Sequence, residues 1–359
     1  MKTKQIFTVT ALAALVVLSG CNLLPGAGAS AAEQTLEALY VQQTVDALGQ
    51  EAQEPQEPQV TDTPAPTPTI EIVHTITSGN PDWVSQYWQE ISSSGTAPEN
   101  RAPGGDFLSQ NLLERPFTSQ DMDYRPDTDL VRVELSHDDT FYYFKLHLEG
   151  ENPDTGFLAA FYGVEFDTDR DGRGDVLLWV RGDGDTEWNI ADVMVYRDAN
   201  DDVGGPRPVQ ADAPGGDGDG YETVLFSPEN PDDPDAAWKR EHPSEENVIQ
   251  LAVKKSMQGG AGAFMWLGWA DDGVSDPALF DYNDAFTLDD AGSPLSNLDA
   301  YPVKELFLAD NTCRIAWGFE PTGFEAGGCV LPTPTPTPAP PTATPEPTPT
   351  PTEELPIVS

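Results

Sequence analysis

The chain of 359 residues has little positive charge and few of the side chains that usually carry out catalysis. It contains 18 Lys and Arg against 61 Asp and Glu, which gives a formal net charge of −43. Such a surface repels phosphate, and this argues against nucleic acid as a partner. No G-x-S-x-G motif is present, and the four histidines are not spaced as metal ligands: His74, His137, His147 and His242. A glycosidase needs a pair of carboxylates, but in a chain with so many acids such a pair always occurs and is no evidence of activity. A glycan-active hydrolase is therefore the third candidate, after the two functions given below.

Long apolar runs are absent except for one near the start of the chain. This run, Ala11 to Leu18, follows Lys2 and Lys4 and is too short to span a membrane. Basic residues before a short apolar segment are typical of a secretory signal peptide. The sequence therefore predicts that residues 1–20 are a signal peptide and not part of a domain.

The signal peptide ends in a sequence that resembles the lipobox of bacterial lipoproteins, Leu18-Ser19-Gly20-Cys21. The resemblance implies that Cys21 becomes the new N-terminus and carries two or three acyl chains, which anchor a protein stably in a lipid bilayer. We therefore expect a lipid-anchored protein of the bacterial cell envelope that faces the exterior or the periplasm. The alternative is an ordinary secretion signal in which the cysteine occurs by chance.

Cysteine is scarce, with three residues in the whole chain. If Cys21 is lipidated, Cys313 and Cys329 remain as a pair in an oxidising compartment, where such pairs form disulfides. In the chain-entropy account, a bridge across so short a loop stabilises the fold by roughly 3 kcal/mol. The pair predicts a small disulfide-stapled C-terminal element over residues 291–331.

Segments rich in Pro, Thr, Gln and Glu flank the central part of the chain. Over residues 21–69 we expect the lipid anchor, a short helix within Ala32–Leu48 and an extended Pro-rich linker. Residues 332–359 are rich in Pro and Thr, which predicts a stiff tail without a core of its own. Both flanks are expected to be disordered, and the first would hold the central domain away from the bilayer.

The central residues 70–290 show hydrophobic alternation with a period of two. Val131, Val133 and Leu135 alternate with charged residues, a polar turn follows, and large apolar residues then alternate with polar ones up to Leu148. This pattern predicts a β-hairpin. No helical stretch is long enough to connect parallel strands, so the sequence predicts a mainly β fold, an antiparallel β-sandwich. Further strands are expected at residues 157–166, 176–180, 192–196, 222–226, 248–253 and 264–269.

The hairpin and the strands after it resemble a known family. The sequence DLVRVELSHDDTFYYFKLHLEG, followed by FYGVEFDTDRDGRGDVLLWV, resembles the DOMON-like sandwiches, which include family 9 carbohydrate-binding modules. The likeness covers residues 129–269 and implies a β-sandwich that binds sugars. Residues 282–329, which end in DNTCRIAWGFEPTGFEAGGC, look like a C-terminal element of bacterial surface lipoproteins, and this second resemblance implies no activity.

The clearest candidate site is an acidic loop at residues 167–175. Carboxylates at alternate positions, with Gly172 at a sharp turn, allow one short loop to surround a hard cation. The loop follows the first half of an EF-hand loop but has Leu178 at the twelfth position, where an EF-hand needs a bidentate Glu. It therefore fits the looser D-x-D-x-D-G class, in which other segments complete the calcium shell. The expected ligands are Asp167, Asp169, Asp171, Asp175 and the carbonyl of Arg173, whose side chain is expected to point away.

A second run of oxygen-bearing side chains comprises Asp198, Asn200 and Asp202, and a third comprises Asp217 and Asp219. If the third to fifth strands are antiparallel, the first two acidic runs lie at the same end of the sheet, and the second run completes the shell of the first. A bound Ca²⁺ would neutralise these carboxylates. The alternative is a solvated acidic turn, because Asp and Gly are also common in tight turns.

Aromatic side chains are the candidates for sugar contacts, because the apolar face of a pyranose ring stacks on an aromatic ring. The strongest candidates are tryptophans in or next to the expected strands. For each of them the alternative is a place in the core. Trp266 and Trp269 lie three residues apart and so on opposite faces of one strand, which predicts one core and one accessible ring. The candidates are Trp179, Trp188, Trp266 and Trp269, with Tyr162 and Tyr196.

These observations predict a surface-displayed, calcium-stabilised binding module, with extracellular polysaccharide as the favoured ligand. The second reading is a structural or adhesion protein of the cell envelope that binds no small ligand. An exposed pair of coplanar aromatic rings on one sandwich face favours the first reading. A face lined only by Thr, Asp and Glu favours the second, and the oligomeric state stays open.

Replacing Cys21 by Ala is expected to abolish acylation, because the thiol that accepts the lipid is lost. The protein should then stay uncleaved, or be miscleaved and released into the medium or the periplasm. Membrane fractionation and metabolic labelling with a fatty acid measure both effects. Unchanged membrane partition together with an undiminished acyl label would contradict the lipoprotein prediction.

Overall fold

The computed structural model describes residues 72–81, 83–201, 203, 220–229, 231–280, 286, 288–293 and 303–330. The chain divides into two compact units, Met1–Ile70 and Glu71–Ser359, and every described residue belongs to the second. Among the described residues, no helix is long and apolar enough to cross a membrane. Several sequence expectations lie outside this part of the chain: Cys21, the short helix, the linker, the tail, Asp202, Asp217 and Asp219.

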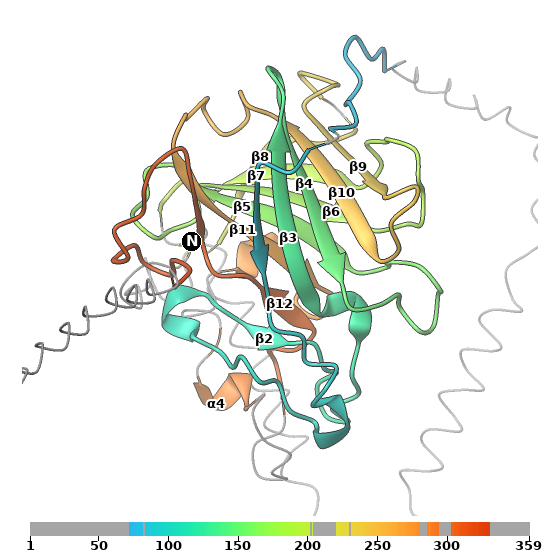
Figure 1. Ribbon diagram of the computed structural model, residues 1–359, viewed down its shortest axis with the longest axis vertical. Coiled ribbons are helices and arrows are strands. Elements are labelled where there is room, and N and C mark those ends of the chain that lie inside the picture. Colours follow the sequence, from blue (N-terminus) through green and yellow to red (C-terminus); the bar gives the residue numbers. More distant parts are fainter. Residues whose placement is uncertain are drawn as a thin grey trace, which may run out of the picture. The chain divides into compact units, whose positions relative to one another are not determined.

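The described part folds as two antiparallel sheets, which confirms the predicted β-sandwich. Figure 1 shows β3, β4 and β10 of the first sheet side by side, with the second sheet behind them. The first sheet has the order β1 (Gln86–Gln89), β3 (Leu130–His137), β4 (Phe141–Leu148), β10 (Val248–Lys254) and β9 (Ala237–Glu241). The second has the order β2 (Glu114–Arg115), β12 (Ala309–Asn311), β11 (Phe264–Asp271), β5 (Phe161–Asp167), β6 (Val176–Arg181), β7 (Val193–Arg197) and β8 (Thr223–Phe226), and β13 (Ile315–Trp317) also pairs with β11.

Helical structure is limited to short turns in the described residues. These are the 3₁₀ turns η1 (Ala97–Glu99), η2 (Leu108–Gln110), η3 (Pro126–Thr128) and η4 (Pro277–Leu279), and the single-turn helix α4 (Leu288–Ala291). None of them connects parallel strands, as the sequence predicted. In the described part, the chain outside the sheets therefore runs mostly through loops.

The main core lies between the two sheets, where the apolar residues of the period-two pattern meet. Val133 and Leu135 of β3 and Phe144 of β4 face this core, together with Phe166 of β5 and Trp266 of β11. Phe144 packs against Phe166 and against Trp266 with ring centroids 5.6 Å and 5.1 Å apart. Burial of these rings and of the aliphatic side chains around them stabilises the packing of the two sheets.

The outer face of the second sheet is also buried. Leu177, Trp179, Leu267 and Trp269 point away from the main core but pack in a second apolar cluster with Phe280. Every residue of β11 is buried as a result. This second layer corrects the expectation for the pair in β11: Trp266 is 1% exposed and Trp269 is 0% exposed, so both tryptophans are core residues.

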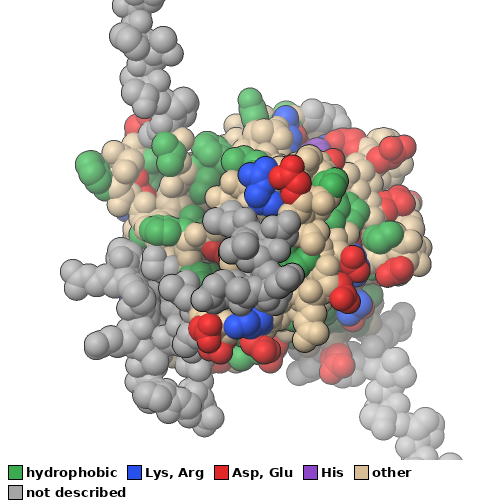
Figure 2. All heavy atoms as spheres, turned by 90° about the horizontal axis from the view of Figure 1, so that it is seen from below, with side chains coloured by type: hydrophobic (Ala, Val, Ile, Leu, Met, Phe, Trp, Pro, Cys, Tyr) green, Lys and Arg blue, Asp and Glu red, His purple; other side chains and the backbone are tan. Residues whose placement is uncertain are grey.

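The surface carries the acidic excess of the composition. Figure 2 views the molecule from the end where β2 and α4 lie and shows acidic side chains around this face, with basic ones in only a few places, most of them beside an acid. Lys304 Nζ and Asp289 Oδ1, for example, lie 3.7 Å apart in an exposed ion pair. Exposed pairs of this kind contribute little to stability.

The segment expected to form a C-terminal element supplies β12 and β13 to the second sheet. Cys313 and Cys329 form a disulfide, as predicted, with their α-carbons 4.9 Å apart. Backbone bonds from Arg314 N to Gly327 O and from Cys329 N to Arg314 O hold the two ends of the loop together. The bridge therefore fixes Arg314, whose side chain is part of the site described below.

Replacing both Cys313 and Cys329 by Ser is expected to lower the free energy of unfolding by roughly 3 kcal/mol, because the unfolded chain regains the entropy of an open loop. Urea denaturation measures the change, with the reduced wild-type protein as the matched control. Equal midpoints for oxidised, reduced and doubly substituted protein would show that the bridge adds no stability.

Candidate functional site

Two acidic loops lie together at one end of the second sheet. The first connects β5 to β6, and the second follows β7. Gly174 N donates to Val203 O at 2.9 Å, and Asp198 N donates to Asp175 O at 3.1 Å. These bonds confirm the prediction, made from strand directions, that the two loops are neighbours.

Each loop is organised by its first aspartate in the same way. Asp167 Oδ2 accepts from Gly172 N at 2.9 Å, and Asp198 Oδ2 accepts from Val203 N at 3.1 Å. In both loops the bonded amide is five residues after the aspartate. In each loop the carboxylate thus folds the backbone back over itself.

The fourth residue of each loop has a left-handed backbone conformation. The φ angle is 69° at Arg170 and 66° at Asp201, and Gly172 at the sixth position of the first loop has φ 95°. A non-glycine residue with positive φ is uncommon and needs support from its surroundings. Two such residues at equivalent positions show that the loops share one fold, although only the first has the glycine.

Three of the four carboxylates predicted for the first loop converge. Oxygen atoms of Asp167, Asp169 and Asp175 lie within 4.8 Å of one another. Asp171 is not among them, because its Oδ1 accepts from Arg173 N at 2.9 Å and its Oδ2 lies 3.6 Å from Arg173 Nε. The loop therefore offers three convergent carboxylates, with Asp171 turned toward the arginine.

The side chain of Arg173 lies across the two loops, whereas the sequence predicted that it points away. Its Nη1 donates to Asp201 O at 2.5 Å, so it fastens the first loop to the second. In the second loop, Asp198 Oδ1 accepts from Asn200 N at 3.0 Å. Asp198 thus organises its own loop, and its role as a ligand of the first loop stays a prediction.

Two aspartates of the loops have raised pKa values, because burial removes part of their hydration and too little positive charge lies near them. Burial raises the pKa of Asp167 to about 7, although Arg314 and the amides of Gly172 and Arg170 act in the opposite direction. Burial, together with the neighbouring loop carboxylates, raises the pKa of Asp201 to about 6. A cation at this place would favour the charged forms of both.

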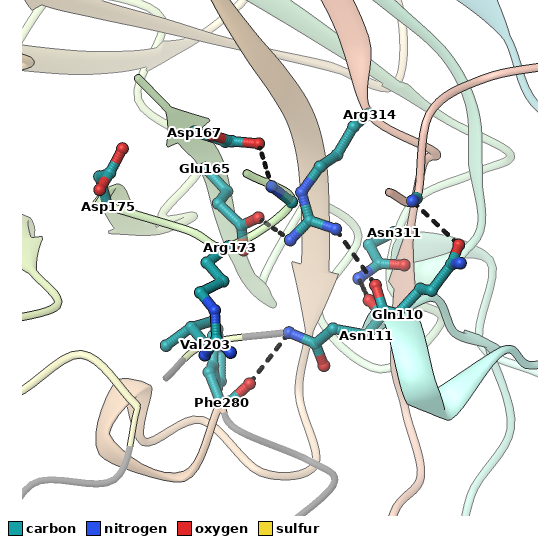
Figure 3. A network of polar contacts seen from close by, with 12 residues as sticks. Gln110, Asn111, Glu165, Asp167, Arg173, Asp175, Val203, Phe280, Asn311 and Arg314 are labelled. Atoms are coloured by element: carbon teal, nitrogen blue, oxygen red, sulfur yellow. Dashed lines mark hydrogen bonds and ion pairs between the residues drawn. The ribbon is translucent and has the colours of Figure 1, made fainter. Parts of the chain in front are cut away.

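A buried ion pair lies beneath the first loop. Arg314 Nη2 bonds Glu165 Oε1 at 2.6 Å, and both side chains are 1% exposed. Figure 3 shows the guanidinium of Arg314 between Glu165 and the carbonyl of Gln110, which accepts at 3.2 Å. The sequence reasoning did not find this pair, although an acid between apolar Val164 and Phe166 in a strand is itself a signal of a buried, partnered carboxylate.

The tryptophans proposed as sugar platforms are mostly enclosed. Trp179 is 2% exposed and packs edge-on against Phe280, in the same outer cluster as Trp269. Trp188 is half-buried, and the Arg240 guanidinium covers its ring at 4.4 Å from the centroid. The indole faces are therefore occupied by protein groups, and Tyr162 is also fully buried.

A hollow of about 800 Å³ lies on the outer face of β5, β6 and β7. Phe161 and Tyr196 are half-buried in its wall, and Phe161 stacks on Trp179 with an angle of 2° between the rings. Trp179 and Tyr196 are the aromatic candidates that line this hollow, and Tyr196 is the more exposed of the two. The lining combines apolar and polar side chains: Phe161, Trp179, Met194, Tyr196, Val274 and Pro277 with Asp192, Ser227, Glu229, Ser275 and Asp276.

The calcium-free protein is expected to lose stability as the pH rises from 5 to 8. The folded-state pKa of Asp167, about 7, lies above the usual value of 3.8, so the folded state binds more protons than the unfolded state over this range. Each such group lowers the free energy of unfolding by at most about 1.4 kcal/mol per pH unit. Urea denaturation across this pH range measures the slope.

The variant Asp167→Asn is the matched control, because it removes this titration, and its slope should be shallower. Added Ca²⁺ should reduce the slope for the wild type by competing with protons for the loop. A calcium-free wild type that becomes more stable between pH 5 and 8 would contradict this account of the loop.

Comparisons with protein families, with characterised proteins and with solved structures find no match for the chain. The likeness of residues 129–269 to the DOMON-like sandwiches therefore stays a prediction from sequence. The loops and the hollow are therefore the features of the protein that bear on its function.

Proposed function

We propose that this protein is a surface-displayed, calcium-stabilised binding module for extracellular polysaccharide, held to the membrane through acylated Cys21. The observation that carries the proposal is the hollow bordered by Phe161 and Tyr196, whose lining also includes residues with carboxylates and hydroxyls. Ligand sites of this class combine an apolar wall with a few polar groups that fix orientation.

The lining of the hollow matches the two chemistries of a sugar ring. The C–H face of a pyranose packs on an aromatic surface such as that of Tyr196. The hydroxyl groups of the sugar donate to carboxylates such as Asp192, Glu229 and Asp276, which also line the hollow. Because these acids and the net charge of −43 repel anions, the favoured ligand is a neutral polysaccharide.

Strand β7 connects the hollow to the acidic loops. Tyr196 borders the hollow, and Asp198, two residues later, begins the second loop. A Ca²⁺ ion at the loops would fix the end of β7 and thereby the position of Tyr196. Binding to the folded state alone also stabilises that state by mass action.

Affinity electrophoresis of the protein in gels that contain neutral polysaccharides tests the proposal. Migration of the wild type should be retarded by at least one polysaccharide in the presence of Ca²⁺. Tyr196→Ala should weaken the interaction at least about tenfold, which corresponds to ~1.4 kcal/mol. Tyr87→Ala is the matched control, because Tyr87 is a 57% exposed tyrosine on β1 of the other sheet and should leave retardation unchanged.

Two outcomes would contradict a polysaccharide-binding module. If no neutral polysaccharide retards the wild type, the structural or adhesion reading is favoured. If Tyr87→Ala and Tyr196→Ala weaken binding equally, the hollow is not the ligand site. Shortening of the polysaccharide during the assay would instead favour a hydrolase.

A further inference from the structure

We propose a second calcium site, formed by Glu114, Asp129 and Asp310 in the interior of the sandwich, at the end opposite to the acidic loops. Oxygen atoms of these three side chains lie within 4.8 Å of one another. They come from three strands or strand ends that are distant in sequence: β2, the residue before β3, and β12. Figure 1 shows β2 and β12 at the end of the sandwich where β3 begins.

All three side chains are enclosed by protein. Asp129 and Asp310 are 0% exposed, and Glu114 is 3% exposed. An ionised carboxylate in such a place needs a positive partner, because the loss of hydration costs several kcal/mol for each charge. The cluster is therefore unlike a solvated acidic patch, which water neutralises.

One oxygen of each aspartate has a hydrogen-bond partner and the other has none. Asp129 Oδ2 accepts from Tyr124 Oη at 2.5 Å and from Ser93 N at 2.9 Å, and Asp310 Oδ2 accepts from Leu130 N at 2.7 Å. The second oxygen, Oδ1, is buried in both residues and bonds to no described residue. Buried acceptors are almost always satisfied, so two unsatisfied ones beside a third carboxylate indicate a missing ligand.

No basic side chain neutralises the cluster in the described part of the chain. None of the three acids forms an ion pair with Lys, Arg or His. Arg115 follows Glu114 directly, but its guanidinium bonds Asp106 and three backbone carbonyls, those of Ala291, Gly292 and Leu306. The nearby Glu90 adds further negative charge to the site of Asp310.

The ligand atoms of the cluster suit Ca²⁺. Carboxylate oxygens are hard ligands, and Ca²⁺ accepts irregular sets of six to eight of them with water. In a chain without the ion, Asp129 Oδ1 and Asp310 Oδ1 stay buried with no hydrogen-bond partner among the described residues. Outside the cell, calcium is available for such a role.

The two sites are separate along the strands. Asp310 pairs with Ala270, which pairs with Tyr162 near the start of β5, whereas Asp167 is the last residue of β5. The five residues from Tyr162 to Asp167 correspond to roughly 17 Å at the rise of an antiparallel strand. One ion cannot serve both sites, so they can be tested independently.

Calcium-45 equilibrium dialysis of the full chain, freed of metal beforehand, tests the proposal. The acidic loop is first disabled by Asp167→Asn with Asp169→Asn, which leaves the buried cluster intact. This loop variant is expected to retain one bound Ca²⁺. Adding Asp310→Asn, or separately Glu114→Gln, should weaken the remaining binding at least tenfold.

Asp235→Asn in the same background is the matched control. Asp235 is also fully buried, but Thr75, Ile76 and His74 satisfy its oxygens, so calcium binding should not change. Thermal melting adds a second readout. Asp310→Asn should melt no lower than its parent without calcium, because a buried charge is removed, and lower than its parent with calcium.

Two results would overturn the proposal. If the loop variant binds no Ca²⁺ at millimolar concentration, the cluster is not a calcium site. The loop variant keeps all three acids of the cluster, so this result cannot come from a substitution there. Unchanged binding after Asp310→Asn or Glu114→Gln shows that the retained ion lies elsewhere. Either result leaves the sugar-binding proposal standing, since the hollow shares no residue with the cluster.

Discussion

Negative charge in the interior is the constraint on which the rest of this structure depends. The chain buries Glu165, Asp167, Glu114, Asp129 and Asp310 although it has few basic residues to pair with them. Taking a carboxylate out of water is unfavourable unless a positive charge accompanies it. Wherever a strand buries an acidic side chain, the sandwich therefore needs either a basic side chain or a bound cation beside it.

Among the described residues the chain supplies this charge where Arg115 pairs with Asp106 and, beneath the acidic loop, where Arg314 pairs with Glu165. Arg314 comes from the C-terminal element, and the disulfide between Cys313 and Cys329 fixes the backbone around it. Because Arg314 also lies close enough to Asp167 to lower its pKa, the same cation supports the acidic loop from beneath. At the buried cluster the described residues offer no such cation, and at the loop surface Arg173 lies beside Asp171 and forms no ion pair with Asp167, Asp169 or Asp175. These are the places to which we assign calcium.

Much of the sandwich could be predicted from the period-two pattern. All eight expected strands form, because residues such as Val133 and Phe144 alternate clearly toward one core. The other five strands of the described chain, such as β2 and β13, are two to five residues long and lie in segments without a clear alternation. The burial of Trp269 was missed because it depends on the second apolar layer around Phe280, which the pattern of a single strand does not reveal.

The acidic loop was visible in sequence because its residues are contiguous. The pairing of Arg314 with Glu165 and the meeting of Glu114 with Asp310 were not, since 149 residues separate the first pair and the second pair depends on how β2 joins β12. The spacing of residues in the sequence predicts local geometry such as the turn from Asp167 to Gly172. Contacts between distant segments depend on the register of the sheets, which spacing does not reveal.

The central claim is that the buried carboxylates without a basic partner hold calcium. The most direct test is an anomalous difference map from crystals of the wild-type protein grown with Ca²⁺, recorded at a wavelength at which calcium scatters anomalously. The account predicts one peak among the oxygens of Asp167, Asp169 and Asp175, and a second between Asp129 Oδ1 and Asp310 Oδ1. A well-phased map with no peak at either position would contradict it.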